Sequence, residues 1–204
     1  MNQLFNKQAS LILLIVLLAS CGEQVKLEPL SYDATIVAFG DSLTFGTGST
    51  KGNDYPYVLS ELLGMKVINA GIPGNTTADG LERINKVLDK HSPSLVILCL
   101  GGNDFLRKRP VEQTRENLNA LIEIIKQKQS QVVLISVPKP AIFLDDAELY
   151  ETIAQQHNIP LLNDTLSELL SDNDLKSDAI HLNDSGYSQL AAAIQNFLIE
   201  RGAL

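Results

Sequence analysis

Tryptophan is absent from the 204 residues of this sequence, and cysteine (two residues) and histidine (three residues) are scarce. No His-x₃-His or Cys-x₂-Cys spacing occurs, so the sequence does not predict a metal site, and we expect no cofactor. Acidic residues outnumber basic ones by 24 to 16, and the formal net charge of −8 disfavours nucleic acid as a partner. The longest apolar run, about ten residues, is roughly half of what a membrane-spanning helix needs.

The N-terminal residues have the three parts of a secretory signal peptide. Met1–Gln8 is polar and carries one cation, Lys7; Leu11–Leu18 is wholly aliphatic; and the small residues Ala19-Ser20 follow. We therefore predict that residues 1–20 are a signal peptide. A buried amphipathic helix is the weaker interpretation, because the aliphatic run has no polar face.

Cys21 stands directly after these small residues. The stretch Leu18–Cys21 (LASC) resembles the lipobox of bacterial lipoproteins, in which the cysteine is lipidated and becomes the first residue. Removal of residues 1–20 leaves 184 residues, with 15 basic residues against 24 acidic ones and a net charge of −9. Because no basic patch is available, we expect membrane attachment through the lipid at Cys21. The resemblance implies the periplasmic face of a bacterial cell envelope, and Gly22, in place of aspartate, favours the outer membrane in a Gram-negative host.

The rest of the chain divides at about residue 34. Residues 21–33 are mixed, polar and interrupted by Pro29, so we interpret them as the lipidated N-terminus and a tether. We assign residues 34–204 to one globular domain, because they contain no internal repeat and no low-complexity segment. One cysteine, Cys99, follows the lipobox; it has no partner for an internal disulfide, and its apolar surroundings predict a small core residue.

Short apolar runs typical of strands buried on both faces alternate with helical patterns along this domain. The predicted strands are Ala34–Phe39, Lys66–Asn69, Leu95–Leu100, Gln131–Val137 and Ile159–Leu162. The predicted helices are Tyr57–Leu63, segments around Leu81–Leu88, Leu118–Ile125 and Leu149–Ile153, and Ser185–Glu200 with Asp184 as its cap. This alternation predicts an α/β fold with a parallel five-stranded sheet and helices on both faces.

Glycine-rich polar segments follow the first three predicted strands. They are Gly40–Leu43 (GDSL), Asn69–Asn75 (NAGIPGN) and Gly101–Asp104 (GGND). In an open α/β sheet, ligands bind beyond the carboxyl ends of the strands. Glycine-rich loops there allow backbone N–H groups to approach a reacting oxygen closely. We therefore expect the functional site at these three loops.

A serine is a weak nucleophile until a base removes its proton, so the three histidines are the candidate partners of Ser42. His91 and His157 each end a helical pattern, where the helix dipole accounts for them. His181 lies just before the last helix, with Asp178 three residues earlier. A carboxylate this close can orient one ring nitrogen and leave the other free to accept the serine proton. Taken alone, this fragment fits a catalytic histidine and a surface loop histidine equally well.

The motifs GDSL, GIPGN, GGND and DAIH follow one another in this order, each at a predicted strand end or helix start. In this pattern the sequence resembles the SGNH, or GDSL-type, hydrolase superfamily from about residue 34 to the C-terminus. Within it, the sequence is most similar to the bacterial periplasmic thioesterase/lysophospholipase and arylesterase group. The resemblance implies a three-layer α/β/α sandwich of the flavodoxin-like type.

The resemblance also implies a role for each motif residue. Ser42 would be the nucleophile, His181 the general base, and Asp178 the residue that orients the imidazole. The N–H of Ser42, the N–H of Gly74 and the side-chain amide of Asn103 would form the oxyanion hole. The implied reaction is hydrolysis of carboxylic esters, with thioesters and lysophospholipids as further substrates, through an acyl-enzyme intermediate.

Two other functions use the same fold. A carbohydrate O-acetylesterase or an acyltransferase of the cell envelope would use the same triad. A non-catalytic binding lipoprotein would be expected to lack a triad or oxyanion residue, and all five positions are filled here. Gly46–Gly52 (GTGSTKG) lacks the Gly-Lys-Ser/Thr order of a phosphate loop, so we expect no nucleotide.

Residues near the motifs receive supporting interpretations. Asp41 is predicted to cap a helix or to hold its loop by hydrogen bonds. Asp104 and Arg107 are predicted to form a local ion pair that supports the Asn103 loop. The residues predicted to line the acyl pocket are Phe105, Leu106, Ile142 and Phe143.

Overall fold

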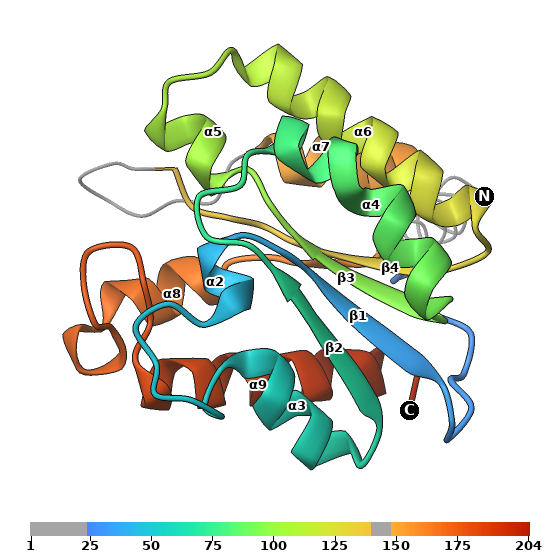
Figure 1. The fold of residues 1–204 in the computed structure, drawn as a ribbon, viewed down its shortest axis with the longest axis horizontal. Helices are drawn as coiled ribbons and strands as arrows, with labels where there is room; N and C mark the ends of the chain where they lie inside the picture. Colours follow the sequence, from blue (N-terminus) through green and yellow to red (C-terminus); the bar gives the residue numbers. More distant parts are fainter. Residues whose placement is uncertain (1–23, 140–147) are drawn as a thin grey trace, which may run out of the picture.

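The computed structural model describes residues 24–139 and 148–204; the predicted signal peptide, Cys21, Ile142 and Phe143 lie outside these ranges. Five parallel strands form one sheet in the order β2-β1-β3-β4-β5 (Figure 1). The strands are β1 (Thr35–Gly40), β2 (Lys66–Gly71), β3 (Leu95–Cys99), β4 (Gln131–Ile135) and β5 (Leu161–Leu162). The predicted parallel α/β sheet is confirmed, and the strand order is the flavodoxin-like one.

The two central strands, β1 and β3, contain the most deeply buried part of the core. Ile36 to Phe39 and Leu95 to Leu98 are all 0% exposed, as expected for strands covered on both faces. Cys99 ends β3 and is 1% exposed, which confirms its prediction as a core residue. The prediction of full burial is wrong for β2, which pairs with β1 on one side alone and consists of exposed and half-buried residues.

Helices cover both faces of the sheet in the three layers of an α/β/α sandwich (Figure 1). One face carries α3 (Tyr55–Leu63), α8 (Thr165–Ser171) and α9 (Asp184–Glu200), and the other carries α4 (Thr77–His91), α6 (Val111–Gln127) and α7 (Leu149–His157). Three shorter elements are α2 (Ser42–Phe45), α5 (Gly102–Leu106) and η1 (Asn173–Leu175). The sequence did not predict these three or α8, because a helix of one or two turns shows too little periodicity. None of the described helices has the length and hydropathy needed to cross a bilayer.

The cap of α9 is Asn183, and not Asp184 as predicted. The Asn183 side chain accepts a hydrogen bond from the N–H of Gly186 at 3.0 Å, and its extended backbone (φ −96°, ψ −175°) is typical of an N-cap. Asp184 is already helical, and its carboxylate accepts hydrogen bonds from the N–H and the hydroxyl of Thr50 at 2.6 and 2.8 Å. Asp184 thereby ties the loop after α2 to the start of α9.

Within the predicted tether, residues 26–30 pack against the domain. Leu27 is 9% exposed, belongs to the hydrophobic core, and donates its N–H to the carbonyl of Arg201 at 2.9 Å. The backbone of Glu28 exchanges two hydrogen bonds, of 2.7 and 2.9 Å, with the side chain of Gln131. Because Gln131 begins β4 and Arg201 follows α9, this segment packs at the amino ends of the strands.

Candidate active site

Ser42 is the first residue of α2, directly beyond the carboxyl end of β1. Its hydroxyl oxygen lies 2.9 Å from Nε2 of His181, and Nδ1 of His181 lies 2.7 Å from Oδ2 of Asp178. Three side chains therefore form one hydrogen-bonded chain, although 139 positions separate Ser42 from His181. Such a chain can pass a proton from the hydroxyl to Nε2.

Asp178 and His181 belong to one short loop between η1 and α9. The loop closes through the N–H of Ser177, which donates to the carbonyl of His181 at 2.9 Å. Oδ1 of Asp178 accepts the N–H groups of Ile180 and His181, both at 2.9 Å. One carboxylate oxygen therefore shapes the loop while the other holds the imidazole.

The side chain of Asp178 is 53% exposed, whereas that of His181 is 14% exposed. Partial burial acts to raise the pKa of Asp178, but the hydrogen bonds from the His181 ring and from backbone N–H groups outweigh it, so the pKa lies below its usual value. An ionised carboxylate at Nδ1 favours the tautomer with its proton on that nitrogen. Nε2 is then an acceptor facing Ser42.

Asp41 precedes Ser42 and is 2% exposed. Its Oδ1 accepts the N–H of Leu43 at 3.0 Å as the cap of α2, and its Oδ2 accepts the side-chain amide of Asn103 at 3.1 Å. Both predicted roles, helix cap and hydrogen-bonded support of the loop, are confirmed. Burial raises the pKa of Asp41 to about 6, and the hydrogen bonds from Leu43 and Asn103 offset it in part.

The carboxyl end of β1 has no room for a side chain at position 40. A Cβ on Gly40 would lie 2.4 Å from the carbonyl oxygen of Cys99 and 2.1 Å from the hydroxyl oxygen of Thr44. Glycine at this position therefore lets α2, with Ser42 at its start, lie directly against the end of β3.

Asn103 lies in α5, just beyond the carboxyl end of β3. Its Nδ2 donates to Oδ2 of Asp41 at 3.1 Å and to the carbonyl of Asn75 at 3.0 Å. Both N–H bonds of this amide therefore have acceptors. A reacting oxygen at this site would replace one of the two as acceptor.

Gly74 lies on the loop between β2 and α4 and has φ +81°, a conformation that strains other residues. Its carbonyl accepts a hydrogen bond from Nη2 of Arg107 at 2.7 Å. The loop of Gly74 is joined to Asn103 through the carbonyl of Asn75. The structure thus places Gly74 on the loop next to the Ser42–Asn103 region, although it does not line the pocket described below.

The predicted ion pair between Asp104 and Arg107 is wrong. Asp104 is 3% exposed, and its carboxylate accepts the N–H and the hydroxyl of Thr77 at 2.9 and 2.7 Å. The side chain turns into the protein because Thr77 begins α4, where free N–H groups favour a carboxylate. Arg107 binds the loop of Gly74 instead, so the two residues support different parts of the site.

Arg83 is a supporting residue that the sequence did not reveal. It lies on α4 with its guanidinium 3.9 Å from the ring centroid of Phe39. Nη2 donates to the carbonyl of Gly40 at 2.8 Å, Nη1 to that of Ala70 at 2.9 Å, and Nε to Oδ1 of Asn75 at 2.7 Å. One side chain thereby joins the carboxyl ends of β1 and β2 to the loop that contacts Asn103.

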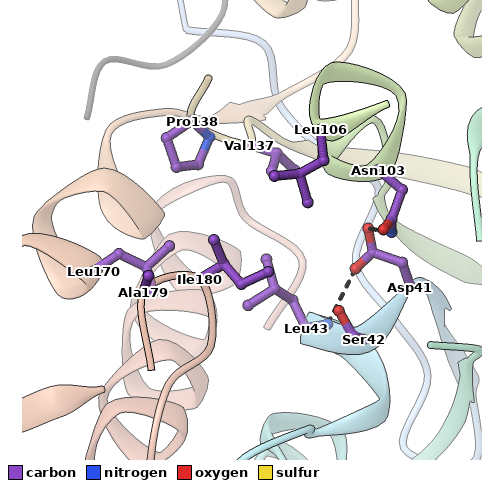
Figure 2. A pocket seen from close by; sticks show the side chains of 11 residues that line it. Asp41, Ser42, Leu43, Asn103, Leu106, Val137, Pro138, Leu170, Ala179 and Ile180 are labelled. Carbon is purple, nitrogen blue, oxygen red and sulfur yellow. Dashed lines mark hydrogen bonds between the residues drawn. The ribbon is translucent and has the colours of Figure 1, made fainter. Parts of the chain in front are cut away.

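A largely apolar pocket opens beside Ser42 (Figure 2). Asp41, Ser42 and Asn103 lie together at one side of it. The apolar residues that line it come from five separate segments: Leu43; Leu106; Val137 and Pro138; Leu170; and Ala179 and Ile180. A polar reacting end and an apolar lining suit a substrate with a short hydrocarbon part next to a carbonyl group.

The profile of the GDSL-like Lipase/Acylhydrolase family matches residues 38–189, which include the whole hydrogen-bonded chain. This chain belongs to that family. It is therefore an ester-hydrolysing enzyme, a hydrolase with bacterial relatives. The Escherichia coli K12 protein named thioesterase 1/protease 1/lysophospholipase L1 is 31% identical over 73% of this chain and 76% of its own. The Vibrio mimicus arylesterase is 27% identical over 81% of this chain and 88% of its own.

Solved structures agree with this assignment. AlinE4, described as an SGNH-hydrolase family esterase, is 32% identical, with a TM-score of 0.66 over 84% of this hydrolase and 97% of its own chain. The esterase EstA from Pseudoalteromonas superposes with a TM-score of 0.76 over 82% of this chain and 98% of its own. At 23% identity, the likeness to EstA concerns the fold.

Two of the four residues predicted to line an acyl pocket lie among the described residues of this hydrolase. Leu106 lines the pocket beside Ser42, whereas Phe105 does not, because its ring packs edge-on against Tyr150 (6.5 Å between centroids, 83° between planes). Neighbouring residues of a helix point in different directions, so α5 turns Leu106 outward and Phe105 towards the core. Ile142 and Phe143 lie outside the described residues.

Sequence reasoning missed most of the pocket of the hydrolase. Val137 and Pro138 follow the carboxyl end of β4, so the rule that found the first three loops would also have found them. Ala179 and Ile180 lie between two candidate triad residues. Leu170 gave no signal, because it lies on α8, which the sequence did not predict.

The two remaining histidines of the hydrolase occupy the predicted helix ends. His91 is the last residue of α4, and His157 is the last residue of α7. A ring nitrogen of His157 lies 3.0 Å from Oδ1 of Asn119. Their positions agree with the interpretation that the helix dipole accounts for them.

Proposed function

We propose that this hydrolase is a lipid-anchored serine esterase in which Ser42 is the nucleophile, His181 the general base and Asp178 the residue that orients the base. The observation that carries the proposal is the continuous chain of contacts, 2.9 Å from Ser42 to Nε2 and 2.7 Å from Nδ1 to Asp178. A hydroxyl hydrogen-bonded to an oriented imidazole is the arrangement that makes serine a nucleophile at neutral pH.

In the first half of the reaction, Oγ of Ser42 attacks the ester carbonyl while its proton passes to Nε2 of His181. The tetrahedral intermediate collapses when the bond to the leaving oxygen breaks, and the imidazolium returns the proton to that oxygen. The products of this half are an alcohol and an acyl-serine. Asp178 remains ionised throughout and stabilises the imidazolium.

Three donors are proposed to stabilise the negative charge on the former carbonyl oxygen. The N–H of Ser42 is free of a helical partner, because it lies at the first position of α2. The N–H of Gly74 and Nδ2 of Asn103 complete the set. Asn103 already binds Asp41 and Asn75, and an oxyanion is a stronger acceptor than the backbone carbonyl of Asn75 that it would replace.

In the second half, a water molecule attacks the acyl-serine and gives one proton to Nε2 of His181. Collapse of the second tetrahedral intermediate breaks the bond to Oγ, which takes the proton back. The carboxylic acid leaves and the resting hydrogen-bonded chain returns. The same contacts serve both halves.

The lining of the pocket supports an ester whose acyl part is hydrocarbon. Seven of its residues are apolar, from Leu43 to Ile180 along the chain. Thioesters and lysophospholipids are proposed as further substrates because of the similarity to the E. coli thioesterase and lysophospholipase.

We place the enzyme in a bacterial cell envelope, anchored through a lipid on Cys21, because the sequence combines a signal-peptide pattern with LASC.

Hydrolysis of p-nitrophenyl esters of graded acyl length by the mature protein tests the assignment. We expect activity in the wild type and a loss of about a millionfold in kcat for Ser42→Ala, with a similar loss for His181→Ala. Activity that survives both substitutions contradicts the triad. An acetylated glycan in the same panel separates an esterase of acyl lipids from a carbohydrate deacetylase.

Two further measurements test the remaining parts of the proposal. A fluorophosphonate probe should label the wild type at Ser42 and leave His181→Ala unlabelled, since the serine needs its base to react. Mass spectrometry of the mature N-terminus should find a lipid on Cys21, and Cys21→Ser should release the protein from membranes. A soluble wild-type protein contradicts the anchor without affecting the triad.

A further inference from the structure

The N-terminal segment is fixed to the end of the domain that lies farthest from the site. Leu27 and Leu30 donate their N–H groups to the carbonyls of Arg201 and Ala203, at 2.9 and 2.8 Å. The ammonium group of Lys26 donates to the carbonyl of Glu200 at 2.7 Å. Together with the Glu28–Gln131 hydrogen bonds described above, these contacts hold the segment along the end of α9 and the start of β4.

The active site lies at the other end of the same elements. β1 begins just after this segment and ends just before Asp41, and its six residues span about 20 Å. α9 begins beside the His181 loop and ends at Glu200, and its 17 residues span about 25 Å. Figure 1 shows α2, α5 and α8 at one end of the molecule, and the chain's C-terminus and the start of β1 at the other.

Little chain remains between the proposed lipid and the docked segment. The first residue of the segment that contacts the domain is Lys26, five residues after Cys21, and five residues reach at most about 17 Å. A domain of this size has a radius of about 20 Å, so a tether of that length permits it to roll by about 80° and leaves the opposite pole about 23 Å above the membrane surface.

We infer that the docked segment orients this enzyme with its active site away from the membrane that holds the anchor. The inference rests on the proposed anchor at Cys21 and the proposed triad. The substrates are then esters that reach the site from the aqueous space, and the lipids of the anchoring bilayer are excluded because the site cannot reach them. The segment thereby selects the source of substrate without contacting it.

Orientation can be measured independently of activity with two exposed positions at opposite ends. Tyr32 is 84% exposed and lies next to the docked segment, whereas Lys51 is exposed and lies on the loop that Thr50 ties to Asp184. Cys99 is 1% exposed, so in Tyr32→Cys and Lys51→Cys the introduced thiol is the reactive one. A fluorophore is attached to each variant of the full lipidated chain in phosphatidylethanolamine/phosphatidylglycerol vesicles that carry nitroxide-labelled headgroups.

We expect the fluorescence at position 32 to lose most of its intensity and the fluorescence at position 51 to lose little. Equal quenching at both positions, or stronger quenching at position 51, overturns the inference. The control is an insertion of about twenty Gly/Ser residues between Glu23 and Gln24, a flexible chain whose average span of about 25 Å frees the domain from the surface. It should lower the quenching at position 32.

The same pair of proteins tests the consequence for substrate. With ester lipids in the vesicle that holds the enzyme, the linker variant should hydrolyse them about tenfold faster or more, because its site can enter a surface of high effective substrate concentration. Both proteins should hydrolyse a water-soluble p-nitrophenyl ester at equal rates. Equal rates on the vesicle lipid also overturn the inference, whereas a Ser42→Ala variant that remains active overturns the proposed triad and leaves the quenching result intact.

Discussion

Two regions adjoin Ser42, and each contributes one aspartate. Asp178 lies on an exposed loop and accepts hydrogen bonds from the His181 ring and from two backbone N–H groups. Asp41 lies in a buried turn and accepts hydrogen bonds from Leu43 and Asn103. The pKa of Asp178 is lowered, whereas burial raises the pKa of Asp41 to about 6.

The difference in exposure between Asp178 and Asp41 gives the same type of side chain two different roles. An exposed carboxylate that accepts three hydrogen bonds is readily ionised, and it can stabilise a cationic imidazole during the reaction. A buried carboxylate is costly to ionise, so its value lies in holding α2 and Asn103 in place. We therefore expect substitutions at Asp178 to act on catalysis, and those at Asp41 to act on stability and on the position of Asn103.

Asp178→Asn should have the largest effect of the four substitutions considered. The amide cannot stabilise the imidazolium and favours the wrong tautomer of His181, so we expect kcat to fall by about 10⁴-fold with little change in the free energy of unfolding. Steady-state kinetics and urea unfolding of the same protein measure the two quantities. A loss of stability in place of activity would give Asp178 the role we assign to Asp41.

Asn103→Ala should rank second. It removes one proposed donor to the oxyanion, so we expect kcat to fall by about 10²–10³-fold while KM stays nearly constant, because the contact forms in the transition state. Near-normal kcat would remove Asn103 from the oxyanion hole. Labelling of Ser42 by a fluorophosphonate serves as the control that the triad is intact.

Asp41→Asn tests the role of Asp41 through the pH dependence of stability. Because the folded-state pKa is about 6 and the ordinary value is 3.8, the protonated acid is favoured in the folded chain. Its contribution to stability is fully present below about pH 4 and is lost as the pH rises through about 6, a change of about 3 kcal/mol. Asp41→Asn should flatten this part of the profile.

Urea unfolding of the wild type and of Asp41→Asn between pH 4 and pH 7 checks the prediction. Asp33→Asn removes the same charge from an exposed position and controls for the change in net charge. Parallel profiles for the wild type and Asp41→Asn would mean that Asp41 titrates alike in the folded and unfolded chains.

Arg83→Met should have the smallest effect of the four. The substitution removes the three hydrogen bonds that the half-buried guanidinium donates, so their acceptors must bind water instead. We expect a loss of about 2 kcal/mol in the free energy of unfolding. Arg83→Lys keeps the charge but cannot reach all three acceptors, so it should restore part of that loss. Thermal unfolding of both variants measures it, and an unchanged wild-type value in Arg83→Met would show that water replaces the side chain fully.

The sequence predicted the parts of the fold that depend on local pattern. The five predicted runs appear as five parallel strands, because alternation of apolar strands and amphipathic helices has few other stable arrangements. The predictions failed where a side chain had two possible partners. Asp184 binds Thr50, and Asn183 is the N-cap of α9. Asp104 binds Thr77, and Arg107 binds the carbonyl of Gly74. Residue type alone does not rank such partners, since the ranking depends on distances set by the packed chain.

The order of residues along the chain specifies which chemical groups follow each strand, and so which groups meet at one edge of a parallel sheet. Three other properties depend on the tertiary fold: the 2.9 Å contact of Ser42 with His181, the buried state of Asp41, and the docking of residues 26–30 far from the site. The reason is physical. Strand and helix patterns arise from interactions between near neighbours, whereas contact distances and burial depend on residues more than a hundred positions away in the chain.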